Sequence, residues 1–226
     1  MTTGHSLDAQ RWEKLCQRLG ISCQSALEKE FQHISAAYGE PHRAYHTIQH
    51  INECLQLLDW ASAPALSFVS QYPALEIALW YHDIVYLPQG SNNERRSADR
   101  AIAFLQANGG TQAQIERVES LIMATCHLEP KPDEGTELTH WMVDIDLAIL
   151  GVSPQRFLQY DEQIRQEYDW VTPTEYRTRR QETLAQFLQR PIIYQSALFR
   201  ERFESQAREN LKAVTYRFSS PQTLST

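Results

Sequence analysis

The sequence predicts an all-α protein, built as a single-domain helical bundle with a C-terminal helical extension. Apolar residues recur at helical spacing along almost the whole chain, and no segment shows the apolar–polar alternation of a half-buried strand. The 226 residues, 42% of them hydrophobic, are enough to bury a full core. No internal repeat and no low-complexity linker divides the chain.

Four parts are expected along the chain. Residues 1–40 are expected to form N-terminal helices that pack on the core, and residues 41–155 to form the core itself. Residues 156–218 are expected to form the C-terminal helical extension, followed by a flexible tail at 219–226. About ten helices account for this length.

The first two helices have clear boundary residues. Residues 6–20 form an amphipathic segment, with Ser6 as its expected N-cap and Gly20 closing it. The second helix is expected over residues 25–40, where it stops before Pro41 because proline cannot continue a helix.

The next two helices are the ones expected to carry polar residues into the core. Residues 45–61 place a stripe of aliphatic side chains on one helix face. Residues 74–86 form the most apolar segment of the chain, and Pro88 and Gly90 end it.

The remaining helices are bounded by Asn, Ser–Pro or Thr–Pro starts and by glycine ends. They are expected at residues 93–110, 111–129, 136–151, 153–170, 172–190 and 196–218.

The bulk composition limits the class of function. A formal charge of −7 and a pI near 5.6 argue against nonspecific binding to nucleic acid, although a small phosphorylated substrate remains compatible. The N-terminus shows no signal peptide, and no apolar run is long enough for a membrane helix. The scattered Cys16, Cys23, Cys54 and Cys126 are expected to be reduced thiols of a cytoplasmic protein.

A pair of histidines opens the candidate site. His46 and His50 are four residues apart, a spacing that puts two side chains on one face of a helix and allows both to bind a metal. The segment HTIQH lacks the glutamate of HExxH proteases, so a protease has no support. Two ordinary surface histidines are the structural alternative.

Two further segments place polar residues where apolar ones are expected. His82 and Asp83 follow each other inside ALWYHDIVY, and Asp144 and Asp146 interrupt WMVDIDLAIL. A carboxylate or imidazole in a low-dielectric core requires a hydrogen bond, an ion pair or a metal ion. A capping or solvent-facing role is the alternative for either aspartate of the second segment.

In this order, H…HD…D resembles the signature of the HD-domain superfamily of metal-dependent phosphohydrolases, in particular its predicted-phosphohydrolase branch. The resemblance covers residues 40–155. It implies that the all-α bundle is of the HD-domain type. The matching segments are YHTIQHI, ALWYHDIVY, NERRSA, MATCHLE and DIDLAILG.

The resemblance also implies a metal site with two imidazoles and two carboxylates. His46 is the alternative to the first histidine of this site, and Asp144 is the alternative to its last aspartate. Such a set suits one divalent ion of Mn, Fe, Co, Ni or Zn better than Ca or Mg. The implied ligands are His50, His82, Asp83 and Asp146.

The implied reaction is attack of a metal-activated water on the phosphorus of a small phosphorylated compound, with nucleotides as one class. Asp83 is expected to orient or deprotonate the water, and Arg43 to contact the phosphate. His127 is expected to reach the substrate, with His46 as a further donor or acid. Glu94 is expected either to bind a water or ligand near the metal or to favour a helix N-terminus.

Three other functions compete with this one. The same scaffold could be a noncatalytic module that binds a metal or a nucleotide, or a helical interaction protein whose polar residues only make core hydrogen bonds. An oxygenase would need more histidines for two irons, and the glycine pair in NGGTQ lacks the lysine of a phosphate-binding loop. The charged helices after residue 155 form a solvated face or an oligomer contact, so a homodimer is compatible with the sequence.

Overall fold

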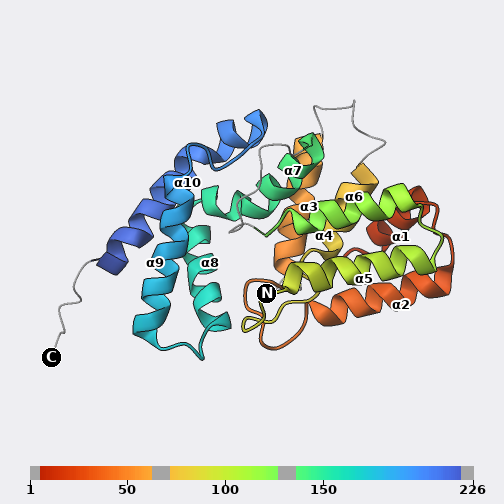
Figure 1. Cartoon of the computed structure of the whole chain (residues 1–226), viewed down its shortest axis with the longest axis horizontal. Helices are drawn as coiled ribbons and strands as arrows, with labels where there is room; N and C mark the ends of the chain where they lie inside the picture. The colour runs from red at the N-terminus through yellow and green to blue at the C-terminus, as the bar shows by residue number, and fades with distance from the viewer. Residues whose placement is uncertain (1–5, 63–71, 127–135, 220–226) are drawn as a thin grey trace. The chain divides into compact units, whose positions relative to one another are not determined.

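The computed structural model describes residues 6–62, 72–126 and 136–219 of the chain. Within these ranges it contains ten α-helices, one 3-10 helix and no strand (Figure 1), which confirms the predicted all-α class. Helices long and apolar enough to cross a bilayer are missing from this part of the chain.

The structure divides into two compact units, Met1–Asp146 and Leu147–Thr226. The sequence predicts one domain with an extension after residue 155. The division between the two units lies directly after Asp146. The expected tail lies, from residue 220 onward, outside the described residues.

Helix α1 (Ala9–Arg18) is capped by Asp8, whose carboxylate accepts hydrogen bonds from two backbone N–H groups of the first turn at 2.9 and 3.0 Å. The expected cap at Ser6 is wrong, because the helix starts later and Asp8 supplies a stronger acceptor. Gly20 adopts a φ of 83° and closes the helix as predicted, since a left-handed residue favours glycine.

Helix α2 (Gln24–Ala37) precedes α3 (Ile48–Ser62), which begins later than expected and leaves His46 in the turn before it. Helix α4 (Tyr72–Tyr81) is buried along its entire length. It ends immediately before His82, so the expectation of a helix up to residue 86 is wrong. The polar pair that follows is therefore carried by a turn rather than by helical backbone.

Helix α4 lies at the centre of the first unit, where it contacts α1, α3, α5 (Asn93–Ala107) and α6 (Gln112–Met123). Helices α5 and α6 pack side by side (Figure 1) and are joined by a glycine turn. The Gly110 N–H donates to the carbonyl of Leu105 at 2.8 Å. A Cβ at Gly110 would lie 2.9 Å from that oxygen, so only glycine fits there.

A buried ion pair fixes α1 on the central helix. The guanidinium of Arg11 donates to Glu76 of α4 at 2.6 Å and to Asp59 of α3 at 2.7 and 2.9 Å. One arginine thus joins three helices. It also neutralises a carboxylate that is only 6% exposed.

The second unit consists of the 3-10 helix η2 and three helices that pack around it. The Ser–Pro and Thr–Pro starts of two of them are confirmed, with Ser153 and Thr172 as N-caps. The Asn210 side chain donates at 2.9 Å to each of two carbonyls at the end of η2, which holds this turn against the last helix. The elements are η2 (Ala148–Gly151), α8 (Pro154–Glu167), α9 (Pro173–Gln189) and α10 (Ala197–Ser219).

Candidate metal centre

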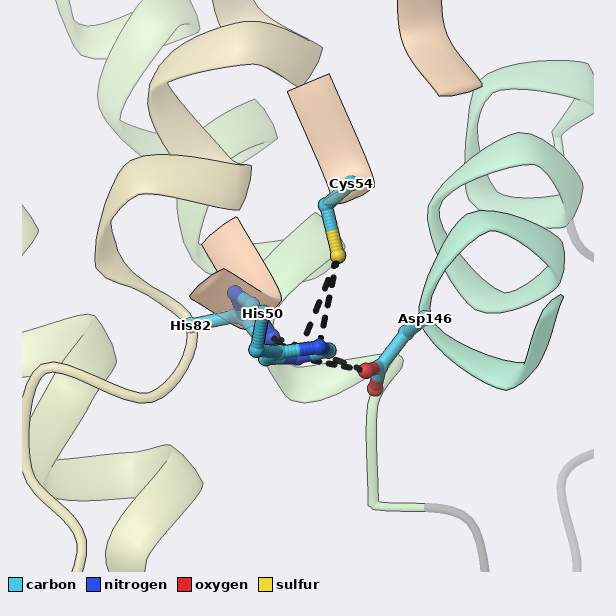
Figure 2. A group of neighbouring side chains, drawn as sticks. All are labelled: His50, Cys54, His82 and Asp146. Atoms are coloured by element: carbon cyan, nitrogen blue, oxygen red, sulfur yellow. Dashed lines mark hydrogen bonds and ion pairs between the residues drawn. The ribbon is translucent and has the colours of Figure 1, made fainter. Parts of the chain in front are cut away.

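Four side chains of the first unit converge from two helices and one turn, and we call them the His–Asp cluster. His50 lies in α3, His82 and Asp83 follow α4, and Asp146 lies near the end of α7 (Glu137–Leu147). Figure 2 shows the two imidazoles and the Asp146 carboxylate pointing toward one another. The side chains of the two histidines are 2% and 0% exposed, whereas the two carboxylates keep 17% and 14%. The carboxylates therefore form the side of the cluster that reaches solvent.

The atom separations in the cluster fit a shared ion. The two histidine Nε2 atoms are 3.0 Å apart. Asp83 Oδ2 lies 3.4 and 3.0 Å from the Nε2 atoms of His50 and His82, and Asp146 Oδ1 lies 3.3 and 3.6 Å from them. Ligands of one transition metal at about 2.1 Å lie about 3.0 Å apart at a right angle and about 3.4 Å apart at the tetrahedral angle. The residues present thus fit one divalent ion with only small shifts.

The hydrogen bond of His82 fixes which nitrogen faces the cluster. Its Nδ1 lies 2.8 Å from the carbonyl oxygen of Leu79, one turn earlier in α4. A carbonyl can only accept, so Nδ1 carries the proton and the neutral ring presents a lone pair on Nε2. A ligand histidine commonly has such an outer partner, which orients the ring and raises its basicity.

The pKa values of His82 and Asp83 are shifted in opposite directions. Burial alone lowers the pKa of His82, but Asp83 and Asp146 outweigh it and hold that pKa well above its ordinary value. Burial alone raises the pKa of Asp83, but His82, together with other imidazoles, holds it well below its ordinary value. Without a cation, protons therefore occupy the place between these groups.

The environment of His50 acts in the same direction. Burial lowers its pKa, but the acidic groups of Cys54 and Tyr45, followed by Asp146 and the other cluster carboxylate, hold that pKa well above its ordinary value. The Tyr45 ring lies 4.7 Å from the imidazole and covers it. A positive charge at this position is thus favoured, whether it is a proton or a metal ion.

Arg43 lies next to the His–Asp cluster but faces the backbone. Its Nε donates to the Glu40 carboxylate at 3.0 Å, and Nη2 forms an ion pair with the same carboxylate at 2.9 Å. Its Nη1 donates to the carbonyls of His46 and Asp83 at 3.1 and 2.6 Å, and Nη2 donates to that of Ile84 at 3.0 Å. Each of the three guanidinium nitrogens therefore has at least one partner within the protein. The expected phosphate contact is therefore not supported, and the side chain instead holds the turn that carries the aspartate.

Two aromatic residues also contact Arg43 or the turn that it binds. The rings of Tyr38 and Tyr86 lie 5.1 and 5.6 Å from the guanidinium carbon of Arg43. The Tyr38 hydroxyl donates to the carbonyl of Trp80 and accepts from the N–H of Asp83, both at 3.2 Å. The backbone of Asp83 is thus held by Arg43 at its carbonyl and by Tyr38 at its N–H.

The other residues named by the sequence take different places. The His46 ring stacks on Tyr86 at 3.9 Å, with its centre 5.9 Å from that of His50. Asp144 is fully buried and lies outside the His–Asp cluster, and Glu94 occupies the first turn of α5. No interaction joins Glu94 to the cluster in the part of the chain described, which fits its helix N-terminal alternative.

One predicted residue and one unpredicted residue remain. His127 lies outside the described residues, so its expected contact with substrate stays a prediction. Cys54, treated in the sequence as an ordinary buried thiol, lies 3.8 Å from both ring nitrogens of His50. The signal was present, since the two residues are four apart and share a face of α3.

Comparison with family models, with curated proteins and with solved structures found no match to this chain.

Proposed function

We propose that this chain is a metal-dependent phosphohydrolase of the HD-domain type that acts on a small phosphorylated compound. The observation that carries the proposal is the spacing of the His–Asp cluster, in which five separations between candidate ligand atoms fall between 3.0 and 3.6 Å. The order of the H, HD and D segments along the chain supports the phosphoester class.

The expected role of each ligand residue follows from the exposure of its side chain. A bound divalent ion supplies a Lewis acid and lowers the pKa of the water that it holds. His50 and His82 form the closed side of the site and exclude water from it. Asp83, at the solvent-reaching side, orients the attacking water and accepts a hydrogen bond from it. Asp146 is the second carboxylate ligand of the ion.

A noncatalytic metal-binding module is the second candidate, and the geometry of Arg43 favours it. Because each guanidinium nitrogen has a partner within the protein and the side chain has no exposed surface, this arginine is not presented to a phosphate. A catalyst on this scaffold must therefore use other donors for the nonbridging oxygens.

The first experiment is metal analysis by mass spectrometry on tag-free protein purified without chelator. We expect about one equivalent of a divalent transition metal, as one four-ligand site implies. Asp146→Asn should lose most of it, because a neutral amide is a poor ligand. Asp99→Asn, which alters an exposed carboxylate of the same unit, is the matched control and should retain it.

The second experiment is a panel of phosphoesters tested with the metal-loaded protein. Turnover that disappears in Asp83→Asn and persists in Asp99→Asn supports the hydrolase. Stoichiometric metal without turnover on any phosphoester supports the binding module. Absence of metal, even after incubation with Mn, Fe, Co, Ni and Zn, would remove both.

A further inference from the structure

A thiol lies beside the His–Asp cluster, and the ligand set proposed above does not use it. Cys54 is only 1% exposed and follows His50 by one helical turn. Its Sγ and the ligand atoms of His50, His82 and Asp146 all lie within 4.8 Å of one another. Figure 2 shows the sulfur approaching the cluster from the side of α3.

The sulfur lies over the imidazole rather than in front of it. It is 3.8 Å from Nδ1 and 3.8 Å from Nε2 of His50. An atom equally distant from both nitrogens is not on the lone-pair axis of either one. Sulfur and nitrogen ligands of one zinc ion lie about 3.6 Å apart at the tetrahedral angle. The thiol is therefore at almost the correct distance from Nε2 but needs a lateral shift, and rotation about its Cα–Cβ bond is the side-chain torsion that can move the sulfur.

The chemistry of the donors distinguishes two sets that share three residues. His50, His82 and Asp146 with Asp83 give a nitrogen and oxygen set, which suits harder ions such as Mn²⁺. The same three with Cys54 give a set of two imidazoles, one carboxylate and one thiolate, which suits four-coordinate Zn²⁺, Cd²⁺ or Co²⁺.

We propose that the cluster offers these two alternative ligand sets, and that Cys54 replaces Asp83 when a thiophilic ion binds. This inference rests on the metal site of the proposed function. As the ion enters, the thiol loses its proton to solvent and the sulfur forms the new bond, while no residue is oxidised or reduced. The thiophilic ion is then held more tightly, and Asp83 is not among its ligands.

Metal selectivity is the expected consequence. Removal of the sulfur in Cys54→Ser should weaken Cd²⁺ binding by about 10- to 100-fold, since a soft ion loses its soft ligand. Binding of Mn²⁺ should change by less than about two-fold, because its set contains no sulfur. Cys23→Ser is the matched control, since it removes an exposed thiol of the same unit and should affect neither ion.

The test is titration of metal-free protein with Co²⁺, followed by absorption spectroscopy. A sulfur-to-cobalt charge-transfer band in the near ultraviolet should accompany the visible bands of bound Co²⁺. The band should persist in Cys23→Ser and disappear in Cys54→Ser and Cys54→Ala.

The outcomes separate this inference from the function on which it rests. Visible bands without the charge-transfer band in the wild-type protein, or with a band that survives in folded Cys54→Ser, would overturn the role of Cys54 and leave the metal site intact. Failure to bind Co²⁺ at all would overturn both. A wild-type spectrum with visible bands and no charge-transfer band overturns the role of Cys54 even if neither Cys54 variant folds.

Discussion

At the scale of the residue, Arg43 shows how a charged side chain can act as a structural part of a site. Its side chain has no exposed surface, and its donors end on carbonyls of His46, Asp83 and Ile84. These carbonyls belong to the two segments that carry the first histidine pair and the HD pair. One guanidinium therefore holds both segments in register for the ligands that they present.

Arg43→Lys should destabilise the protein and loosen the metal site together. A lysine has three donors on one nitrogen and cannot reach all four acceptor groups, so buried carbonyls lose their partners at a cost of about 1–3 kcal/mol. Metal affinity should fall by about 10- to 100-fold, as for other outer partners of ligand residues. Urea unfolding of the metal-free protein and metal titration measure the two effects.

The matched control is Arg179→Lys, at a helix-surface ion pair where the arginine is 70% exposed. It should change the free energy of unfolding by less than about 0.5 kcal/mol. If Arg43→Lys behaves like this control in both measurements, the arginine does not position the cluster.

At the scale of the element, α4 determines where the HD pair lies. It packs against helices α1, α3, α5 and α6. Its last residues lead directly into the turn with His82 and Asp83. The carbonyl of Leu79 also receives the hydrogen bond that orients the His82 ring. The same helix thus supplies core packing through its side chains and ligand orientation through its backbone.

Leu79→Ala should separate these two contributions. The side chain is fully buried, so its truncation should lower the free energy of unfolding by about 2–5 kcal/mol. The backbone carbonyl remains, so the folded variant should bind metal with near wild-type affinity. Leu87→Ala, at a leucine that is 43% exposed, is the control and should cost less than about 0.5 kcal/mol. Equal costs for the two variants would contradict a central α4.

Sequence patterns predicted the elements better than their ends. Periodicity placed all ten helices, since burial of an apolar stripe controls helix position. The end of α4 was missed because it depends on Arg43, which is distant in the chain from the carbonyls that it binds. Apolar spacing cannot show such a contact.

The sequence also predicted most, but not all, of the residues at the candidate site. The sequence brought His50, His82, Asp83 and Asp146 into one candidate set, and the structure places their side chains together. It did not include the thiol of Cys54, although the spacing of four residues from His50 places both side chains on one face of α3.

At the scale of the whole molecule, the metal-free cluster couples stability to pH. The raised pKa values of His50 and His82 stabilise the fold below about pH 6.5, and this contribution is lost as pH rises through the folded values. The lowered pKa of Asp83 stabilises the fold above about pH 4 and is lost as pH falls through its folded value. The cluster therefore contributes most between these limits when no ion is bound.

Metal binding should make the protein more stable as the pH rises above about 6.5, where the metal-free cluster loses stability. An ion needs the unprotonated imidazoles, so it displaces the protons that the raised pKa values retain, and its affinity should rise with pH. The gap in Tm between metal-loaded and metal-free protein should therefore widen from about pH 5.5 to about pH 8. Thermal unfolding at fixed metal concentration measures the gap, and Asp146→Asn, which weakens the site, should keep it small throughout. A gap that stays constant or narrows with rising pH would show that the ion does not replace protons on His50 and His82, and that it binds elsewhere.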